Sequence, residues 1–148
     1  MTRYVLDASV AAKWFLPRAH ETLVDEALAL LSDYAADRIS LLAPDLLWPE
    51  FANILWKAVK RRRISTALAH EAIAELLSLE IVSVASSSLL DNAFTIAARF
   101  DRTVDDALYI AVAAESGAAV ITADERLVNS LASRLSVRWL GAYPSFSE

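Results

Sequence analysis

Cysteine is absent from the 148 residues, and histidine occurs only at His20 and His70. The lack of cysteine excludes disulfides, thiolate metal sites and thiol nucleophiles. Two histidines are too few for a catalytic zinc held by three of them. Any catalytic chemistry must therefore depend on carboxylates, hydroxyls, lysine or arginine.

Glycine and proline are scarce, with two glycines and four prolines in the chain. They do not cluster, so the sequence contains no flexible linker and no low-complexity segment. The length is typical of one domain, and we expect a single domain over residues 1–148. Hydrophobic residues make up 56 % of the chain, which is enough to build a sizeable core.

Long uncharged runs are missing too, since the longest stretch without Asp, Glu, Lys or Arg spans residues 81–90. A membrane helix needs about 18 or more apolar residues, so no spanning segment is expected. Asp7 arrives too early for a secretory signal, whose apolar region has about 7–15 residues. These features predict a cytoplasmic protein. The formal net charge of -5 argues against a broad basic surface but allows a local basic patch.

Short apolar or β-branched runs alternate with longer alanine- and leucine-rich segments. The short runs predict strands at Tyr4–Leu6, Ser40–Ala43, Ile81–Val84, Ala119–Thr122 and Val137–Leu140. The longer segments have helical spacing and predict helices at Glu21–Tyr34, Leu46–Lys60, Thr66–Leu79, Leu89–Phe100, Asp105–Ser116 and Glu125–Leu135. Because parallel strands are joined by crossovers, this alternation predicts a three-layer α/β/α sandwich with a mainly parallel sheet of four to five strands.

Ligands of such sheets collect beyond the carboxyl ends of the strands, so residues found there are functional candidates. Asp7 directly follows the first strand, and Ser9 lies two residues later, where a helix is expected to start. The structural alternative is that Ser9 caps this helix and Asp7 shapes the turn. Asp124 follows the fourth strand, where its structural role would be to cap the next helix.

Glu50 and Asp106 lie near the starts of predicted helices. Asp45 is the expected cap of the helix that contains Glu50, and Asn53 follows Glu50 on the same face. The apolar neighbours of Glu50 make a charge costly there unless it has a partner. Thr103 has the spacing of a capping box with Asp106, which explains one acid of that segment without any function.

Asp7, Glu50, Asp106 and Asp124 share one property, since a parallel sheet would deliver all four to the same edge. Two carboxylates about 4 Å apart repel by roughly 4 kcal/mol at an effective dielectric of 20, so such a cluster needs raised pKa values or a cation. An all-oxygen site suits Mg²⁺ or Mn²⁺. Such an ion polarises phosphoryl oxygens and lowers the pKa of bound water, so the pattern predicts metal-dependent phosphodiester hydrolysis.

Three segments of the chain also resemble a known family. Val5-Leu6-Asp7-Ala8-Ser9, Asp106-Ala107-Leu108-Tyr109 and Thr122-Ala123-Asp124, with Glu50 and Asn53 between the first two, resemble the PIN domain, and more narrowly VapC-type toxins of toxin-antitoxin pairs. The resemblance covers nearly the whole chain. It implies a Mg²⁺- or Mn²⁺-dependent endoribonuclease that is usually a homodimer and is silenced by a cognate antitoxin.

Carried over by position, the resemblance implies site residues as well. Asp7, Glu50 and Asp106 would be the central acids, Asp124 the fourth, Ser9 the hydroxyl near the metal water, and Asn53 a supporting amide. The sequence departs from the family pattern at Asp105, where an aromatic residue is common, which leaves Asp105 and Asp106 as alternatives for the third acid. It departs again at Lys60–Arg63, where a glycine often precedes the next helix.

Two further groups of residues have open interpretations. Lys60, Arg61, Arg62 and Arg63 form the one basic cluster, which either complements the negative end of a helix dipole or contacts RNA phosphates. Trp14 and Phe15 fall in a short helix that Pro17 ends. They are either core residues or, by the resemblance, part of the surface that binds the antitoxin.

Other enzyme classes fit poorly. A haloacid-dehalogenase-like phosphatase needs an aspartate where Ser9 stands, and a dinucleotide-binding domain needs a glycine-rich turn after the first strand. A phospho-receiver domain needs an aspartate after a central strand, whereas Ile81–Val84 leads into alanine and serines. The alternative that remains is a non-catalytic protein of the same fold that binds RNA or a partner with the help of a metal.

Overall fold

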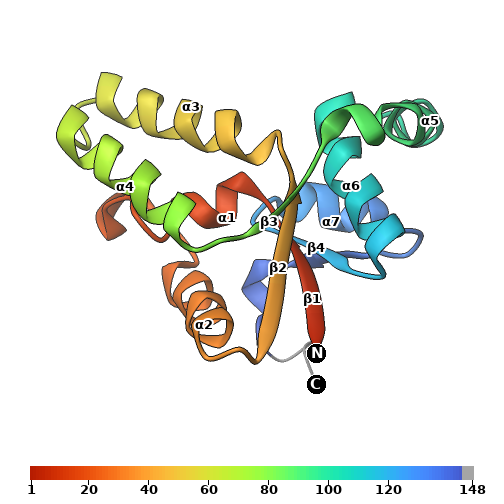
Figure 1. Ribbon diagram of the computed structural model, residues 1–148, viewed down its shortest axis with the longest axis horizontal. Helices are drawn as coiled ribbons and strands as arrows, with labels where there is room; N and C mark the ends of the chain where they lie inside the picture. The colour runs from red at the N-terminus through yellow and green to blue at the C-terminus, as the bar shows by residue number, and fades with distance from the viewer. Residues whose placement is uncertain (145–148) are drawn as a thin grey trace.

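A computed structural model describes residues 1–144, which fold around one twisted parallel sheet (Figure 1). The strands are β1 (Thr2–Leu6), β2 (Ile39–Pro44), β3 (Val82–Val84), β4 (Ala119–Thr122) and β5 (Val137–Trp139). They lie in the order β3-β2-β1-β4-β5, and every neighbouring pair is parallel. The strand order reverses between β1 and β4, which makes the end of that pair the expected ligand crevice.

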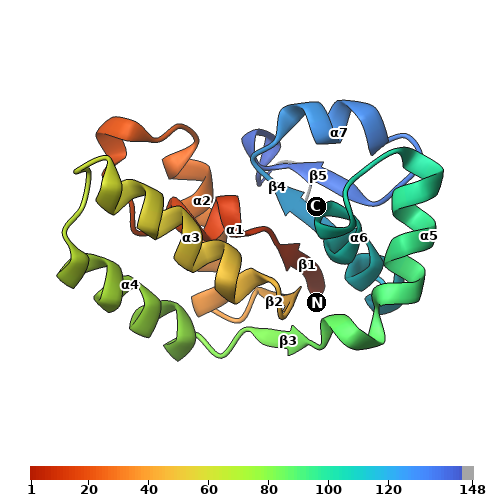
Figure 2. The same cartoon turned by 90° about the horizontal axis from the view of Figure 1, so that it is seen from above.

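Helices cover both faces of the sheet. They are α1 (Ala8–Ala12), α2 (Val24–Ala35), α3 (Leu47–Lys60), α4 (Thr66–Ser78), α5 (Leu90–Phe100), α6 (Val104–Ser116) and α7 (Glu125–Leu131). In the view from above, α1 to α4 lie on one side of the sheet and α5 to α7 on the other (Figure 2). The predicted three-layer α/β/α sandwich is confirmed, and the sheet has five strands. Among residues 1–144, no helix is long and apolar enough to cross a membrane.

Successive residues of the central strands point to opposite faces and so supply two separate cores. Tyr4 and Leu6 of β1 pack into the core beneath α1 to α4, whereas Val5 between them packs into the core beneath α5 to α7. Ile121 and Val120 of β4 divide in the same way. The continuous apolar runs of these strands are therefore explained by burial on both faces.

The structure corrects three helix boundaries. The helix expected from Glu21 begins only at Val24, because Leu23 adopts the left-handed conformation with φ 56°. The helix expected to reach Leu135 ends at Leu131, and a tight turn follows it, in which the Arg134 N–H donates to the Leu131 carbonyl at 2.9 Å. Trp14 and Phe15 lie beyond the end of α1, in tight turns before Pro17, which disfavours helix at the residue preceding it.

Two predicted caps are wrong and two are confirmed. Asp7, and not Ser9, is the N-cap of α1, and Asp45 instead accepts a hydrogen bond from the Ser86 hydroxyl. Thr103 caps α6 by accepting from the Asp106 N–H at 3.1 Å. Asp124 caps α7 by accepting from the Leu127 N–H at 3.2 Å.

Candidate active site

Three carboxylates from three different elements line one small cavity at the carboxyl edge of the sheet. Asp7 follows β1, Glu50 lies in the first turn of α3, and Asp106 lies in the first turn of α6. Together with Tyr109 and apolar residues of β4, α6 and α7, they surround about 40 Å³ of space. The cavity lies beside the reversal in strand order, where an open parallel sheet binds its ligands.

Asp7 is held by hydroxyl groups. Its Oδ2 atom accepts from Ser9 Oγ at 3.0 Å and from Thr122 Oγ1 at 2.7 Å. Burial raises the pKa of Asp7, and the negative charge of Asp106 raises it further, while the two hydroxyl hydrogen bonds lower it in part. The hydroxyls therefore favour the ionised form of a carboxylate that its surroundings would otherwise protonate.

Glu50 has a single well-defined partner. Its Oε1 atom accepts a hydrogen bond from the Tyr109 hydroxyl at 2.5 Å. Burial raises the pKa of Glu50, the Tyr109 bond lowers it in part, and the charges of Asp7, Asp105 and Asp106 raise it again. The acids therefore lie close enough for their negative charges to oppose the ionisation of Glu50.

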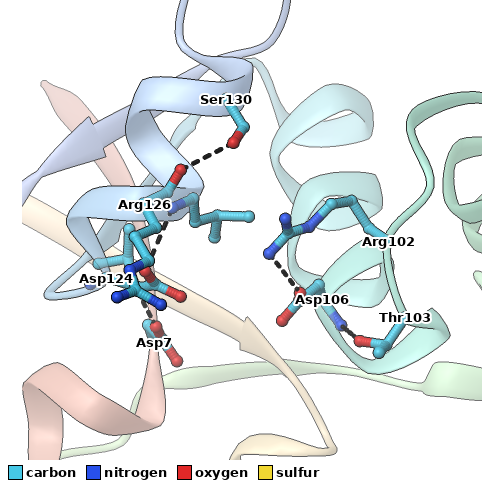
Figure 3. Close-up of polar contacts among 9 residues, drawn as sticks. Asp7, Arg102, Thr103, Asp106, Asp124, Arg126 and Ser130 are labelled. Atoms are coloured by element: carbon cyan, nitrogen blue, oxygen red, sulfur yellow. Dashed lines mark hydrogen bonds and ion pairs between the residues drawn. The ribbon is translucent and has the colours of Figure 1, made fainter.

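Asp106 occupies the third position through its place on α6 (Figure 3). Its backbone N–H is bound by the Thr103 cap, and its Oδ2 atom accepts from Arg102 Nη2 at 3.1 Å, one helical turn away. Asp105, the other acid of this pair, is exposed and does not line the cavity. The geometry therefore favours Asp106 as the third acid.

Asp124 does not line the cavity formed by the other three acids. Its side chain caps α7, and its backbone N–H donates to Thr122 Oγ1 at 3.1 Å. The same Thr122 hydroxyl donates to Asp7, so the two acids are joined through one buried threonine. In the close-up, Asp124 lies on the Asp7 side of the site, opposite Asp106 and Arg102 (Figure 3).

The donor set of the site consists of carboxylate and hydroxyl oxygens, which suits a hard cation. Within residues 1–144, no three acidic or histidine side chains converge closely enough to hold one metal ion together. Mg²⁺ is usually held by one or two carboxylates and keeps several waters, so the wider spacing still fits this ion. Asp7, Glu50 and Asp106 would share such an ion, at most two of them by direct contact and the rest through its waters.

A second hollow of about 240 Å³ opens from the acids along α3. Asp7, Ser9 and Glu50 form one end of it, and Asn53 and Lys57 line it further along the helix. This places Asn53 in the groove, as its spacing from Glu50 predicts. Lys57 adds a positive charge that the sequence patterns did not single out.

The structure divides the basic cluster. Arg61 and Arg63 line a separate hollow with Lys57 and His20. Lys60 instead lies over the exposed Trp56 ring, with its Nζ atom 5.4 Å from the ring centroid. The four basic residues therefore do not share one surface.

Trp14 and Phe15 pack against neighbouring residues and also line a groove. Trp14 Nε1 donates to the Ala27 carbonyl at 2.7 Å, and the Phe15 ring meets Phe51 edge-on at 5.6 Å, so both side chains contribute to packing. Both also line an open groove of about 240 Å³ with residues of α3 and α4. Their exposed edges are therefore part of a partly apolar surface.

Three residues that contact the acids were not assigned roles from the sequence. Thr122 and Tyr109 belong to the segments that resemble the PIN domain. The signal for Thr122 is a hydroxyl at the end of a buried strand, and the signal for Tyr109 is a hydroxyl one helical turn after Asp106. Arg102 precedes Asp106 by four residues, which is the spacing of a helical ion pair. Each of these signals depends on knowing that the acid lies in the site.

The fold and the site together define an α/β protein whose carboxylates gather at the switch point of a parallel sheet. Residues 4–130 match the PIN domain, and the chain belongs to this family.

Known proteins resemble the chain over most of its length. Ribonuclease VapC3 of Pyrobaculum aerophilum is 30 % identical over 129 residues, which cover 84 % of this chain and 92 % of that protein. A crystal structure of a Pyrobaculum aerophilum protein superposes with a TM-score of 0.69 at 23 % identity, covering 95 % of this chain and 85 % of the other. The structure of VapC20 of Mycobacterium tuberculosis, described as a sarcin-ricin loop cleaving toxin, superposes with a TM-score of 0.63 at 18 % identity. The match covers 89 % of this chain and 95 % of VapC20.

Proposed function

We propose that this protein is an endoribonuclease that hydrolyses RNA phosphodiester bonds and acts as the toxin of a toxin-antitoxin pair. The observation that carries the proposal is the placement of Asp7, Glu50 and Asp106 around one cavity at the switch point of the sheet. The ribonuclease relative, which is similar over most of both chains, supports RNA as the substrate. The structural neighbour that cleaves the sarcin-ricin loop has the same fold.

Mg²⁺ or Mn²⁺ is the cofactor that we assign to this site, held directly by Asp7 and Asp106 and through its waters by Glu50. When bound, such an ion supplies polarisation of a phosphoryl oxygen and a water of lowered pKa. Ser9 and Thr122 favour the ionised form of Asp7 by donating to its Oδ2 atom, which offsets part of the effect of burial on its pKa. We assign Asp124 an indirect role: its backbone N–H donates to Thr122 Oγ1, and the same hydroxyl donates to Asp7.

Glu50 is the residue that we assign to proton transfer. Its pKa lies above the ordinary carboxyl value, closer to the working pH that favours a general base. The Tyr109 hydroxyl fixes Oε1, which orients the carboxylate and leaves the second oxygen to accept a proton from an attacking water. Lys57 lines the same groove and adds a positive charge that would attract a polyanion.

The partner that we assign is a cognate antitoxin protein. Solved toxin-antitoxin structures from Rickettsia felis and Klebsiella pneumoniae contain chains of this fold. The groove beside Trp14 and Phe15 offers the apolar surface that such a partner would cover. We also propose a homodimer, because Leu90 and Phe94 of α5 leave 50 % and 67 % of their surface exposed.

The test is cleavage of total cellular RNA by the purified protein with Mg²⁺ or Mn²⁺. We expect cutting that a chelator stops and that Asp7→Asn and Asp106→Asn each reduce by at least about 100-fold, as loss of a central charge-stabilising group does. Glu115→Gln, an exposed acid far along α6, is the matched control and keeps full activity.

The alternative is a non-catalytic protein that uses the same acidic pocket to bind RNA or a partner. Like the nuclease, it would use Asp7, Glu50 and Asp106 with a metal, but without turnover. Well-folded protein, freed from any antitoxin, that cuts no RNA under either metal would establish it. Cutting that persists in both aspartate variants would instead place the chemistry outside this site.

A further inference from the structure

A positively charged hollow lies next to the active-site groove, at the C-terminal end of α3. It encloses about 120 Å³, and three cationic side chains line it, from Lys57, Arg61 and Arg63. Its walls include the apolar side chains of Leu16 and Ile54. The hollow therefore has the size and charge to receive one small anionic group.

Among residues 1–144, the cations of this hollow have no carboxylate partner in an ion pair. Glu21 is the acid that lines it, and Glu21 is already paired with the buried Lys13 at 3.2 Å. Within residues 1–144, the ion pairs of the structure involve none of Lys57, Arg61 and Arg63. Complementing the dipole of α3 does not explain the arrangement, since Arg63 lies beyond the helix end.

The backbone at the end of α3 selects which arginines face the hollow. Arg62 adopts the left-handed conformation with φ 59° and turns the chain. The Arg63 N–H then binds the Ala58 carbonyl at 2.9 Å, and the Arg62 N–H binds the Val59 carbonyl at 3.0 Å, which is a Schellman motif. Arg61 and Arg63 thereby line the hollow, while Arg62 does not.

The hollow adjoins the active-site groove along one stripe of α3. Glu50, Ile54, Lys57 and Arg61 follow each other at steps of three and four, and Ile54 and Lys57 line both the groove and the hollow. Eleven residues separate Glu50 from Arg61, which is about 16 Å of helix and about five nucleotides of stacked single strand.

We infer that this hollow is a phosphate subsite that binds the RNA backbone several nucleotides from the cleaved bond. The inference rests on the proposed ribonuclease function, because the phosphate in the hollow would belong to the RNA strand that is bound in the acidic site. Arginine suits the role, since its guanidinium group binds a phosphate through two parallel hydrogen bonds. The subsite favours RNA that is long enough to reach it and does not select a base sequence, because phosphate contacts carry no sequence information.

The test compares two double variants that remove the same charge from the same turn. Arg61→Gln with Arg63→Gln removes the arginines of the hollow, and Lys60→Gln with Arg62→Gln removes the residues that do not line it. Binding of fluorescein-labelled single-stranded RNA of 12 and 4 nucleotides is measured by anisotropy with Mg²⁺, with Asp7→Asn added to prevent cleavage. Cleavage of total RNA is measured without that change.

We expect the hollow variant to bind the 12-nucleotide RNA about tenfold more weakly, to bind the 4-nucleotide RNA unchanged, and to lose about 0.7 from the slope of log affinity against log salt. Its KM for RNA rises while kcat stays the same. The control variant keeps the affinity and slope of the parent. Equal weakening in both variants, or equal weakening for both RNA lengths, would overturn the subsite.

The two proposals fail in distinguishable ways. If the protein cuts no RNA but the hollow variant alone loses affinity for the longer strand, the subsite stands and the ribonuclease function fails. If the protein cuts RNA and both variants bind alike, the function stands and the subsite fails. Unchanged circular dichroism and thermal midpoints exclude misfolding as the cause of either result.

Discussion

At the scale of single residues, the acids of this protein are kept in a setting that opposes their charge. Asp7 and Glu50 have raised pKa values chiefly because they are buried, and each also faces the charge of Asp106. Hydroxyl groups of Ser9, Thr122 and Tyr109 offset part of this cost by donating to the carboxylates. The folded protein therefore binds protons more tightly at these positions than the unfolded chain does.

This gives the stability of the metal-free protein a definite dependence on pH. Between the ordinary carboxyl pKa and the raised folded value, the folded state of Asp7 holds a proton that the unfolded chain releases. This proton binding stabilises the folded state fully below the unfolded pKa of Asp7, and the stabilisation is lost as the pH rises through the folded pKa. Asp7→Asn removes this loss and, because asparagine is an equally good N-cap, keeps the cap of α1.

We therefore expect the thermal midpoint of Asp7→Asn, measured in chelator between pH 4 and 8, to exceed that of the wild type by a margin that grows with pH and then levels off. Glu115→Gln serves as the control and should run parallel to the wild type. A margin that stays constant, or that shrinks as the pH rises, would show that ionisation of Asp7 does not destabilise the folded state.

At the scale of elements, the sequence predicts all five strands and the six longer helices to within a few residues. Apolar periodicity succeeds because both cores require it, and strand ends then identify Asp7 and Asp124 as candidates. Periodicity fails where the backbone conformation determines a helix boundary. At Leu23, for example, the left-handed conformation makes α2 begin only at Val24. It also gives no access to Thr122 and Tyr109, whose roles depend on acids far away in the sequence.

Substitutions at two helix ends should change the stability of the protein in opposite directions. Both α3 and α6 end with a left-handed residue, which is Arg62 after α3 and Gly117 after α6. A side chain costs roughly 1 kcal/mol in that conformation, and a Cβ at Gly117 would meet no atom within 4 Å. We expect Arg62→Gly to raise the free energy of unfolding by about 1 kcal/mol and Gly117→Ala to lower it by about as much.

Urea denaturation of the two variants checks this pair. Equal slopes with shifted midpoints would confirm that only stability has changed. Cleavage of RNA should be unaffected by Gly117→Ala, since Gly117 lies at the opposite end of α6 from Asp106. Shifts of the same sign in both variants would contradict the backbone explanation.

At the scale of the whole molecule, the site joins the two halves of the sandwich. Glu50 belongs to α3 in the layer of α1 to α4, Asp106 belongs to α6 on the other face, and Asp7 ends the central strand between them. The carboxylates repel one another across this junction. An ion bound there would relieve repulsion between the two layers, so its binding should stabilise the entire fold and not only one segment.

Divalent cations should therefore raise the thermal midpoint of the wild type. An ion at 100 times its dissociation constant that binds only the folded state adds about 2.7 kcal/mol, or about 5–10 °C for a chain of this size. Differential scanning fluorimetry over a titration of Mg²⁺ and Mn²⁺ measures the shift. Asp7→Asn and Asp106→Asn should lose most of it, because each removes one charge that attracts the ion.

The controls separate a specific site from general screening of a chain with net charge -5. Sodium chloride at matched ionic strength should give a much smaller shift, because screening lacks direct ligation. Glu115→Gln removes the same charge from an exposed surface and should keep the full response. If all three variants respond alike, the ion acts on the molecule as a whole, and the acidic cavity is not its site.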